Sequence, residues 1–376
     1  MVCKRPMLFT ALLVISLAIL FAGVSGCERR DEPIKIGLSI NLSGRGGTAG
    51  EHIRDGALLA VDEVNNSGGI NGRPLLLLVR DDENSDEGIR KADASLVKEG
   101  VVAVIGHSYS SNTVKAYPYI TSHNILMITA YTATTKLSGQ DDLFLRTSVD
   151  CNIYGKKAAA LLAEKNVTTV SFLMDMSNPA FVQDYVEQIQ KNYQGSIATV
   201  QFESRTNVDW DNVTTELMAN NPQAIVMLTE ASMTAVAVQK LKGSNFSGDL
   251  IGTIWTHSPE LIRIGGPDTE GVSLVTFIDP ENQRPGYLDF SEKLQEYFGK
   301  SATARSARAY EMINLLAQGL GNCQNINAAE LKAELLKEKY ESILGPVAFD
   351  RFGDVLRPVY EVVVKDGRFT NAGEIH

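Results

Sequence analysis

The sequence has few of the residues that build disulfide frameworks, metal centres or nucleic-acid surfaces. Its 376 residues include 4 cysteines and 5 histidines, and 45 acidic residues outnumber 35 basic ones. The histidines are scattered and no two stand at the spacing of zinc ligands, so we predict no metal site. A net charge of −10 disfavours binding to nucleic acid or anionic lipid through charge. Stabilisation by core packing is therefore expected.

Long apolar runs are also scarce, and the conspicuous one lies at the N-terminus. The basic pair Lys4-Arg5 precedes an apolar stretch from Met7 to Phe21, then the small residues Val24-Ser25-Gly26, then Cys27. This order is typical of a secretory signal, here residues 1–26, and its end resembles the lipobox of bacterial lipoproteins, with Cys27 as the lipid attachment site. The alternative is an uncleaved membrane anchor. Both place the rest of the chain outside the cytoplasm, in the periplasm or another extracytoplasmic space.

Beyond that segment, the cysteines are Cys151 and Cys323. We interpret them as buried free thiols, with a disulfide between them as the alternative. The segment carries two basic and no acidic residues, so its removal changes the net charge from −10 to −12. The remaining length fits two domains of ordinary size, and we expect a monomer.

Short apolar strands alternate with amphipathic helices from Ile34 onward. The first half predicts strands at Ile34–Ile40, Leu75–Arg80, Val101–Ile105 and Ile125–Thr129, with a glycine-rich loop at Ser43–Gly50. Helices are predicted around residues 53–64, 86–99 and 111–119. Strands this uniformly apolar are covered on both faces, as in a parallel sheet flanked by helices.

The pattern restarts after a crossover at Phe144–Asp150. Strands are predicted at Thr169–Asp175, Ile197–Phe202, Ala224–Leu228, Leu250–Ile254 and Val272–Phe277. Two later helices, Tyr287–Phe298 and Arg305–Leu320, have no sheet of their own and are expected to return to the first lobe. The predicted fold is α/β, with two doubly wound parallel-sheet lobes joined by a three-stranded hinge. We assign residues 33–147 plus 277–356 to lobe 1 and residues 148–276 plus 357–376 to lobe 2.

A possible dinucleotide fingerprint, Gly44-x-Gly46-x-x-Ala49, lies between a strand and a helix. That fingerprint needs an acidic residue about 20 positions further on. The nearest acid at a strand end, Asp81, lies 37 residues after Gly44. We interpret the segment as a glycine loop that lets the backbone approach a ligand, and we predict no cofactor.

A second enzyme-like motif, Gly106-His107-Ser108-Tyr109-Ser110, nearly reproduces a nucleophile elbow. Ser110 replaces the final glycine, and beyond His257 no later Asp…His pair stands out. A hydroxyl-rich loop that leads from a strand into a helix suits anion binding, because the helix start offers free N–H groups. An exported esterase that uses Ser108 stays open as the alternative from a different class.

Several segments together resemble the type I periplasmic binding proteins, and more narrowly the leucine/isoleucine/valine-binding protein family of ABC importers. The similarity spans almost the whole chain after the signal segment. Its motifs are Ile34-Lys-Ile-Gly-Leu-Ser-Ile, Gly56-Ala-x-x-Ala60-Val-Asp-Glu-Val-Asn65, Gly68-Gly-Ile-Asn-Gly72, Asp81-Asp82, Gly106-His-x-x-Ser110-Ser111, Ile125-Leu-Met-Ile-Thr129, Phe144-Leu-Arg146-Thr and Gly345-Pro-Val-x-Phe349-Asp-x-x-Gly353.

The resemblance implies ligand contacts from the first lobe. Ser110, with the adjacent Ser111, corresponds to the family position that binds a ligand carboxylate through hydroxyl and backbone groups. The loop Tyr131–Ala133 supplies further contacts. Ala133 aligns with a family threonine, and Thr132 and Thr134 are the candidates to replace it.

The second lobe departs from the family at three aligned positions. Asn178 stands near a family tyrosine, Glu230 near an aromatic residue, and Trp255 near the glutamate that grips the ligand ammonium. Glu230 is interpreted either as a new ammonium partner or as a solvated acid at a strand end. Trp255 is either a pocket wall or core. Tyr310, on a returning helix, resembles a ligand-contacting position, with helix packing as the alternative.

The implied function is that of an extracytoplasmic substrate-binding lipoprotein of an ABC importer. It would bind an amino acid, of the branched-chain type by family default, or a similar small carboxylate, and close about its hinge. Its partners would be that ligand, the membrane permease and, through the lipid anchor, the membrane. A sensing module with the same fold is the second candidate.

Overall fold

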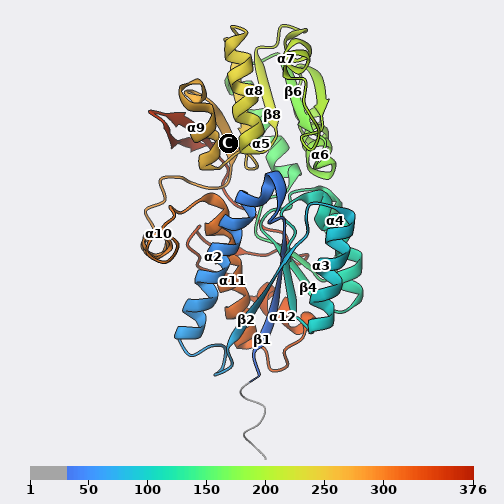
Figure 1. The fold of residues 1–376 in the computed structure, drawn as a ribbon, viewed down its shortest axis with the longest axis vertical. Helices are drawn as coiled ribbons and strands as arrows, with labels where there is room; N and C mark the ends of the chain where they lie inside the picture. The colour runs from blue at the N-terminus through green and yellow to red at the C-terminus, as the bar shows by residue number, and fades with distance from the viewer. Residues whose placement is uncertain (1–31) are drawn as a thin grey trace, which may run out of the picture.

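The computed structural model describes residues 32–376, and the predicted signal segment and Cys27 lie outside the described residues. The chain forms two lobes stacked along its longest axis (Figure 1). Among residues 32–376, none of the helices is both long and apolar enough to cross a membrane.

The first lobe is built on a five-stranded sheet in the order β2-β1-β3-β4-β5, parallel throughout. Its strands are β1 (Ile34–Ile40), β2 (Leu75–Asp81), β3 (Ala103–Gly106), β4 (Leu126–Thr129) and β5 (Phe144–Arg146). Both faces are covered, because side chains alternate along a strand. In β1 the even-numbered residues from Ile34 to Ile40 enter one core cluster, while Gly37 lies against Leu96 on the other face.

Helices α2 (Gly47–Asn66) and α11 (Ala304–Asn322) cover the face of this sheet that the even-numbered β1 residues enter, together with α10 (Pro285–Phe298) and α12 (Ala328–Lys337). Helices α3 (Asp86–Glu99) and α4 (Ser110–Ser122) cover the opposite face. The expected return of the two long helices to the first lobe is confirmed. The expected loop at Ser43–Gly50 is wrong in part, since a 3₁₀ turn at Gly44–Gly46 leads directly into α2.

The second lobe contains a seven-stranded sheet in the order β14-β13-β10-β9-β8-β6-β7. Five of its strands, β6 (Thr169–Asp175), β7 (Ser196–Phe202), β8 (Ala224–Leu228), β9 (Asp249–Thr253) and β10 (Ser273–Thr276), repeat the order of the first sheet. Helices α5 (Cys151–Glu164) and α6 (Pro179–Gln190) pack on one face, and α7 (Trp210–Met218) and α8 (Ala231–Gly243) on the other.

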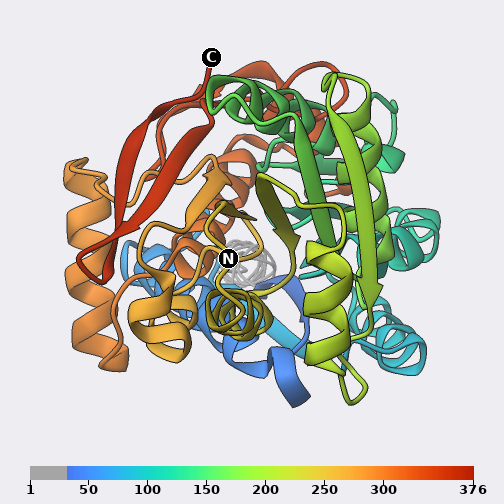
Figure 2. The same ribbon diagram turned by 90° about the horizontal axis from the view of Figure 1, so that it is seen from above.

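A C-terminal hairpin of β13 (Tyr360–Lys365) and β14 (Arg368–Glu374) extends the second sheet in antiparallel fashion. It forms one edge of the lobe, opposite β7 (Figure 2). The sequence reading did not identify this hairpin, nor the short helices α9 (Pro259–Gly265) and α12, nor the small pair β11 (Lys339–Tyr340) and β12 (Val347–Ala348). A signal for the hairpin was present, because Asp366-Gly367 supplies two positive φ angles, 52° and 69°, at its turn.

The chain passes between the lobes three times, through residues 147–150, 277–284 and 356–359. The two-lobe α/β fold predicted from the sequence is therefore confirmed, with a mixed second sheet. Cys151 and Cys323 are free and buried, as interpreted.

Candidate ligand-binding site

The carboxyl ends of the parallel strands in the two lobes face one another, which is where open α/β sheets bind ligands. A small chamber of about 20 Å³ lies between them, with room for roughly one water molecule, so the lobes are close together at this point. Its lining from the first lobe and first crossing is Ser108, Tyr131, Ala133, Ser148, Arg305 and Arg308. Its lining from the second lobe is Asn178, Phe181, Ile254 and Trp255.

The first direct link between the lobes joins the beginnings of α4 and α6. The Ser111 backbone N–H donates to Asn178 Oδ1 at 3.0 Å, and the Ala180 N–H donates to Ser111 Oγ at 3.0 Å. Free N–H groups at helix starts need hydrogen-bond acceptors. Here a side chain of the other lobe accepts a hydrogen bond from the start of each helix. Two predicted site residues, Ser111 and Asn178, thus contact each other.

Asp184 of α6 makes the second link. Its carboxylate accepts from the Thr134 hydroxyl at 3.1 Å and from both the hydroxyl and the backbone N–H of Thr135. On the other side of the cleft, His52 Nε2 lies 3.6 Å from Glu260 Oε1. The interaction with His52 lowers the pKa of Glu260 to about 2, against the opposing effect of burial.

Aromatic rings from both lobes meet beside the chamber. Tyr109 of the first lobe packs edge-on against Trp255 of the second, with ring centroids 5.7 Å apart, and Phe181 does so at 5.9 Å. Burial raises the pKa of Tyr109 well above its usual range, so its hydroxyl stays neutral. These rings make one side of the chamber apolar.

Two buried arginines of α11 give the chamber a positive charge. Arg308 donates through Nε to Ala304 O and through Nη1 to Ala130 O, and its guanidinium lies 4.6 Å from the centre of the Tyr131 ring. Arg305 donates through Nη2 to Trp255 O at 3.2 Å. Burial lowers the pKa of Arg308 to about 10, which still leaves it cationic at neutral pH.

The predicted first-lobe residues differ in how they are placed relative to the chamber. Tyr131 and Ala133 line it directly. Ser110 supports that loop from behind, because its hydroxyl accepts from the Ala133 N–H at 3.2 Å. Thr132 points away and pairs with the Thr113 hydroxyl at 2.6 Å. The Tyr131 hydroxyl donates to Arg305 O at 2.9 Å, which ties the loop to α11.

Among the predicted second-lobe residues, Asn178 and Trp255 line the chamber and Glu230 does not. Glu230 precedes α8 and borders two flanking cavities of about 240 and 210 Å³. Its Oε1 accepts from the Ser232 hydroxyl at 2.7 Å.

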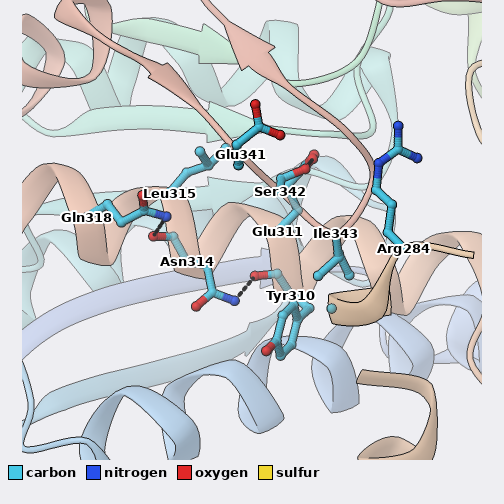
Figure 3. A pocket seen from close by; sticks show the side chains of 10 residues that line it. Arg284, Tyr310, Glu311, Asn314, Leu315, Gln318, Glu341, Ser342 and Ile343 are labelled. Atoms are coloured by element: carbon cyan, nitrogen blue, oxygen red, sulfur yellow. Dashed lines mark hydrogen bonds between the residues drawn. The ribbon is translucent and has the colours of Figure 1, made fainter. Parts of the chain in front are cut away.

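Tyr310 is remote from the other predicted residues. It packs on Phe290 with ring centroids 4.8 Å apart, and its hydroxyl donates to Glu63 in α2. It borders a separate pocket of about 330 Å³ in the first lobe, between α11 and the segment around Ser342 (Figure 3). The structure therefore places Tyr310 in helix packing.

Ser108, the candidate nucleophile of the esterase alternative, accepts a hydrogen bond from the Asn41 N–H at 3.3 Å. Neighbouring His107 is turned to Asp82 and Asp93. His257 contacts Thr276 instead, and burial, reinforced by the arginines of α11, lowers its pKa to about 3. Within residues 32–376, no base is hydrogen-bonded to Ser108, so the motif lacks the geometry of an activated serine.

Comparison with known families bears on this arrangement of two lobes with a chamber between them. The sequence model of a family described as periplasmic binding protein matches residues 33–368. The chain belongs to this family. The resemblance to its leucine/isoleucine/valine-binding members is confirmed as well.

Relatives and solved structures agree with this membership. The leucine-, isoleucine-, valine-, threonine- and alanine-binding protein of Pseudomonas aeruginosa is 22% identical over 346 residues, covering 90% of this chain and 91% of the relative. A branched-chain amino acid transporter substrate-binding protein from Streptococcus pneumoniae, in complex with isoleucine, has a TM-score of 0.83 at 20% identity, covering 91% and 100%. A solute-binding protein from R. palustris in complex with benzoate has a TM-score of 0.81 at 16% identity, covering 91% and 96%.

Four polar or aromatic residues that line the chamber of this periplasmic binding protein were not predicted from the sequence: Ser148, Phe181, Arg305 and Arg308. The sequence does contain a pattern that indicates a special role for the two arginines. They lie one turn apart on a helix that returns to the first lobe and is otherwise largely apolar. That they face the chamber follows only from the packing of α11 against the loop after β4.

Proposed function

We propose that this periplasmic binding protein is the substrate-binding component of an ABC importer and holds an amino acid or a similar small carboxylate between its lobes. The observation that carries the proposal is the interlobe chamber, which combines guanidinium, hydroxyl and aromatic groups from both lobes. Sites of this kind are concave and mostly apolar, with a few polar groups that fix orientation.

The proposed mechanism is hinge closure. Ligand first meets the first lobe at the Tyr131–Ala133 loop and α11. The second lobe then brings Asn178 and Trp255 over it and excludes water. A ligand drives closure only if it binds the closed form more tightly, so the second-lobe contacts must add affinity. The permease then recognises the closed form.

The proposed location is the outer side of the cytoplasmic membrane, with the protein held as a monomer by a lipid on Cys27. The lipobox-like sequence before Cys27 supports this anchor. The acidic charge of the chain supports attachment through lipid, because an acidic surface gains nothing from anionic headgroups.

The test combines thermal-shift screening of a metabolite panel with small-angle X-ray scattering. A ligand that binds the native state raises the melting temperature, and a saturating ligand should reduce the radius of gyration. Identical scattering profiles with and without every compound that binds would refute closure. Labelling of Ser108 by a fluorophosphonate probe would instead support the esterase.

A further inference from the structure

Resting on the proposed function, we propose that the ligand is a carboxylate without an ammonium group, carrying a flat or branched apolar body. Arg305 binds its carboxylate, and the aromatic wall of the second lobe covers its body. This narrows the substrate class from amino acids to apolar organic acids.

The charge balance of the chamber points to an anion. Arg305 and Arg308 are 5% and 3% exposed, and within residues 32–376 neither has a carboxylate within 4.0 Å. Burying a cation without a counterion is costly, and two such cations one helical turn apart also repel. An anionic ligand supplies the missing countercharge.

Of the two arginines, Arg305 uses fewer of its guanidinium donors within the described protein. Arg308 is held by two backbone carbonyls and the Tyr131 ring. Within the described part of the chain, the Arg305 guanidinium makes one hydrogen bond, to Trp255 O, and its buried Nε has no hydrogen-bond partner. A guanidinium offers paired N–H donors that match the two oxygens of a carboxylate. A ligand carboxylate can therefore accept hydrogen bonds from the Nε side of the Arg305 guanidinium.

The same lining disfavours a ligand ammonium. The chamber wall contains no acidic residue among the described residues, whereas two cations border it. Glu230 and Glu260 line the flanking cavity of about 210 Å³, which Arg305 also borders, and neither lines the chamber itself. An amino-acid ammonium placed in the chamber would lie beside two guanidiniums and would have no carboxylate partner there. The repulsion between these cations is stronger in the buried, weakly polar chamber than it would be in water.

The ligand body meets Phe181, Ile254 and Trp255. Rings that already pack edge-on accept another flat group readily, and a branched aliphatic group fills the same space through dispersion. Because the chamber in this arrangement has room for roughly one water, such a body binds to a form with separated lobes, which then close around it as far as its volume allows. Arg305 links binding to closure, since Trp255 O on the second lobe already holds it.

Isothermal titration at pH 7.5 with matched compounds tests the inference. The compounds are 3-phenylpropanoate (anion), L-phenylalanine (zwitterion) and 3-phenylpropanamide (neutral), with 4-methylpentanoate and L-leucine as an aliphatic pair. We expect at least one anion to bind about 30-fold or more tightly than its zwitterionic partner and, for the phenyl series, its neutral partner. Arg305→Gln should weaken that anion by about tenfold or more. Arg90→Gln, on the exposed surface of α3, is the control and should change nothing.

Tighter or equal binding of the zwitterion overturns the inference, as does an anion affinity unchanged by Arg305→Gln. In either case a ligand-induced decrease in the radius of gyration would leave the proposed function intact. Binding by none of the five compounds also overturns the inference, and the broad metabolite panel then decides the proposed function separately. If Arg305→Gln does not fold, the comparison of anion, zwitterion and amide on the unmodified protein decides the matter alone.

Discussion

The backbone N–H of Ser111 in the first lobe donates a 3.0 Å hydrogen bond to Asn178 Oδ1 in the second. The start of α4 is the place where the sequence predicted that a ligand carboxylate would bind. In this arrangement the protein itself supplies the acceptor. A ligand anion is therefore more favourably bound by Arg305, whose Nε has no hydrogen-bond partner among residues 32–376.

Asn178→Ala should shift the ligand-free protein toward separated lobes. The substitution removes the acceptor of the Ser111 N–H, and one such hydrogen bond contributes about 1 kcal/mol net, roughly a fivefold change in the closed population. Distance distributions between spin labels placed one on each lobe would measure it. Asn192→Ala, an exposed asparagine of the same lobe, is the matched control. Indistinguishable distributions for the two variants would show that the Ser111–Asn178 contact does not hold the lobes together.

Ser110→Ala should weaken ligand binding while the protein stays folded. The Ser110 hydroxyl accepts from the Ala133 N–H, so its loss frees the loop that carries Tyr131 and leaves one buried donor without a partner. The expected loss is about 1–2 kcal/mol in binding, a factor of roughly 5–30 in Kd. Isothermal titration measures the affinity, and circular dichroism checks the fold. An unchanged Kd would remove the Ser110–Ala133 contact from the site.

Stability should fall as the pH rises above neutrality, because of His107. Burial opposes its charge, but hydrogen bonds to Asp82 and Asp93 prevail and raise its pKa from 6.5 to about 9. The folded state holds this proton more tightly than the unfolded state, so the stabilisation is complete below pH 6.5 and lost as the pH rises through about 9. The effect is roughly 1.4 kcal/mol per pKa unit.

Denaturant unfolding at pH 6.5 and pH 9.5 measures this loss, and His107→Asn should flatten the dependence while lowering stability at the lower pH. A wild-type unfolding free energy that stays level or rises over this interval would contradict the charged state assigned to His107.

Gly56→Ala should destabilise the first lobe. A methyl group at Gly56 would lie 2.1 Å from the Ser306 carbonyl oxygen, so α2 and α11 must move apart. Overpacking of this kind costs about 1–3 kcal/mol. Gly243→Ala is the control, because a methyl group at this α8 position meets nothing within 4 Å. Differential scanning calorimetry should show a lower Tm for the first variant only, and equal values for the two would mean that the helices accommodate the methyl group.

Much of the fold could be predicted because it depends on local patterns. The bounds of β8 follow from an uninterrupted apolar run, and those of β1 and β6 from short segments in which apolar residues predominate. Those of α3 follow from its caps, since the Ser85 side chain accepts from the Gly88 N–H and Gly100 adopts a φ of 71°. The hairpin β13–β14 was missed because β14 is largely exposed and carries little apolar alternation.

The site was only partly predictable because it depends on contacts between distant segments. Tyr131, Asn178 and Trp255, which line the chamber, were identified through the resemblance to a known family, because they align with its ligand-contacting positions. Arg305 was not, because its exposure to the chamber depends on how α11 packs between the loop after β4 and the second lobe. Tyr310, on the same helix, points instead to α2.

A crystal structure of the protein with 4-bromobenzoate, located by the anomalous signal of its bromine, tests the central claim most directly. We expect the bromine beside Phe181 and Trp255, and a carboxylate oxygen about 3 Å from the Arg305 guanidinium, with both lobes in contact with the ligand. Bromine density outside the interlobe chamber, or a carboxylate bound without Arg305, would contradict the account.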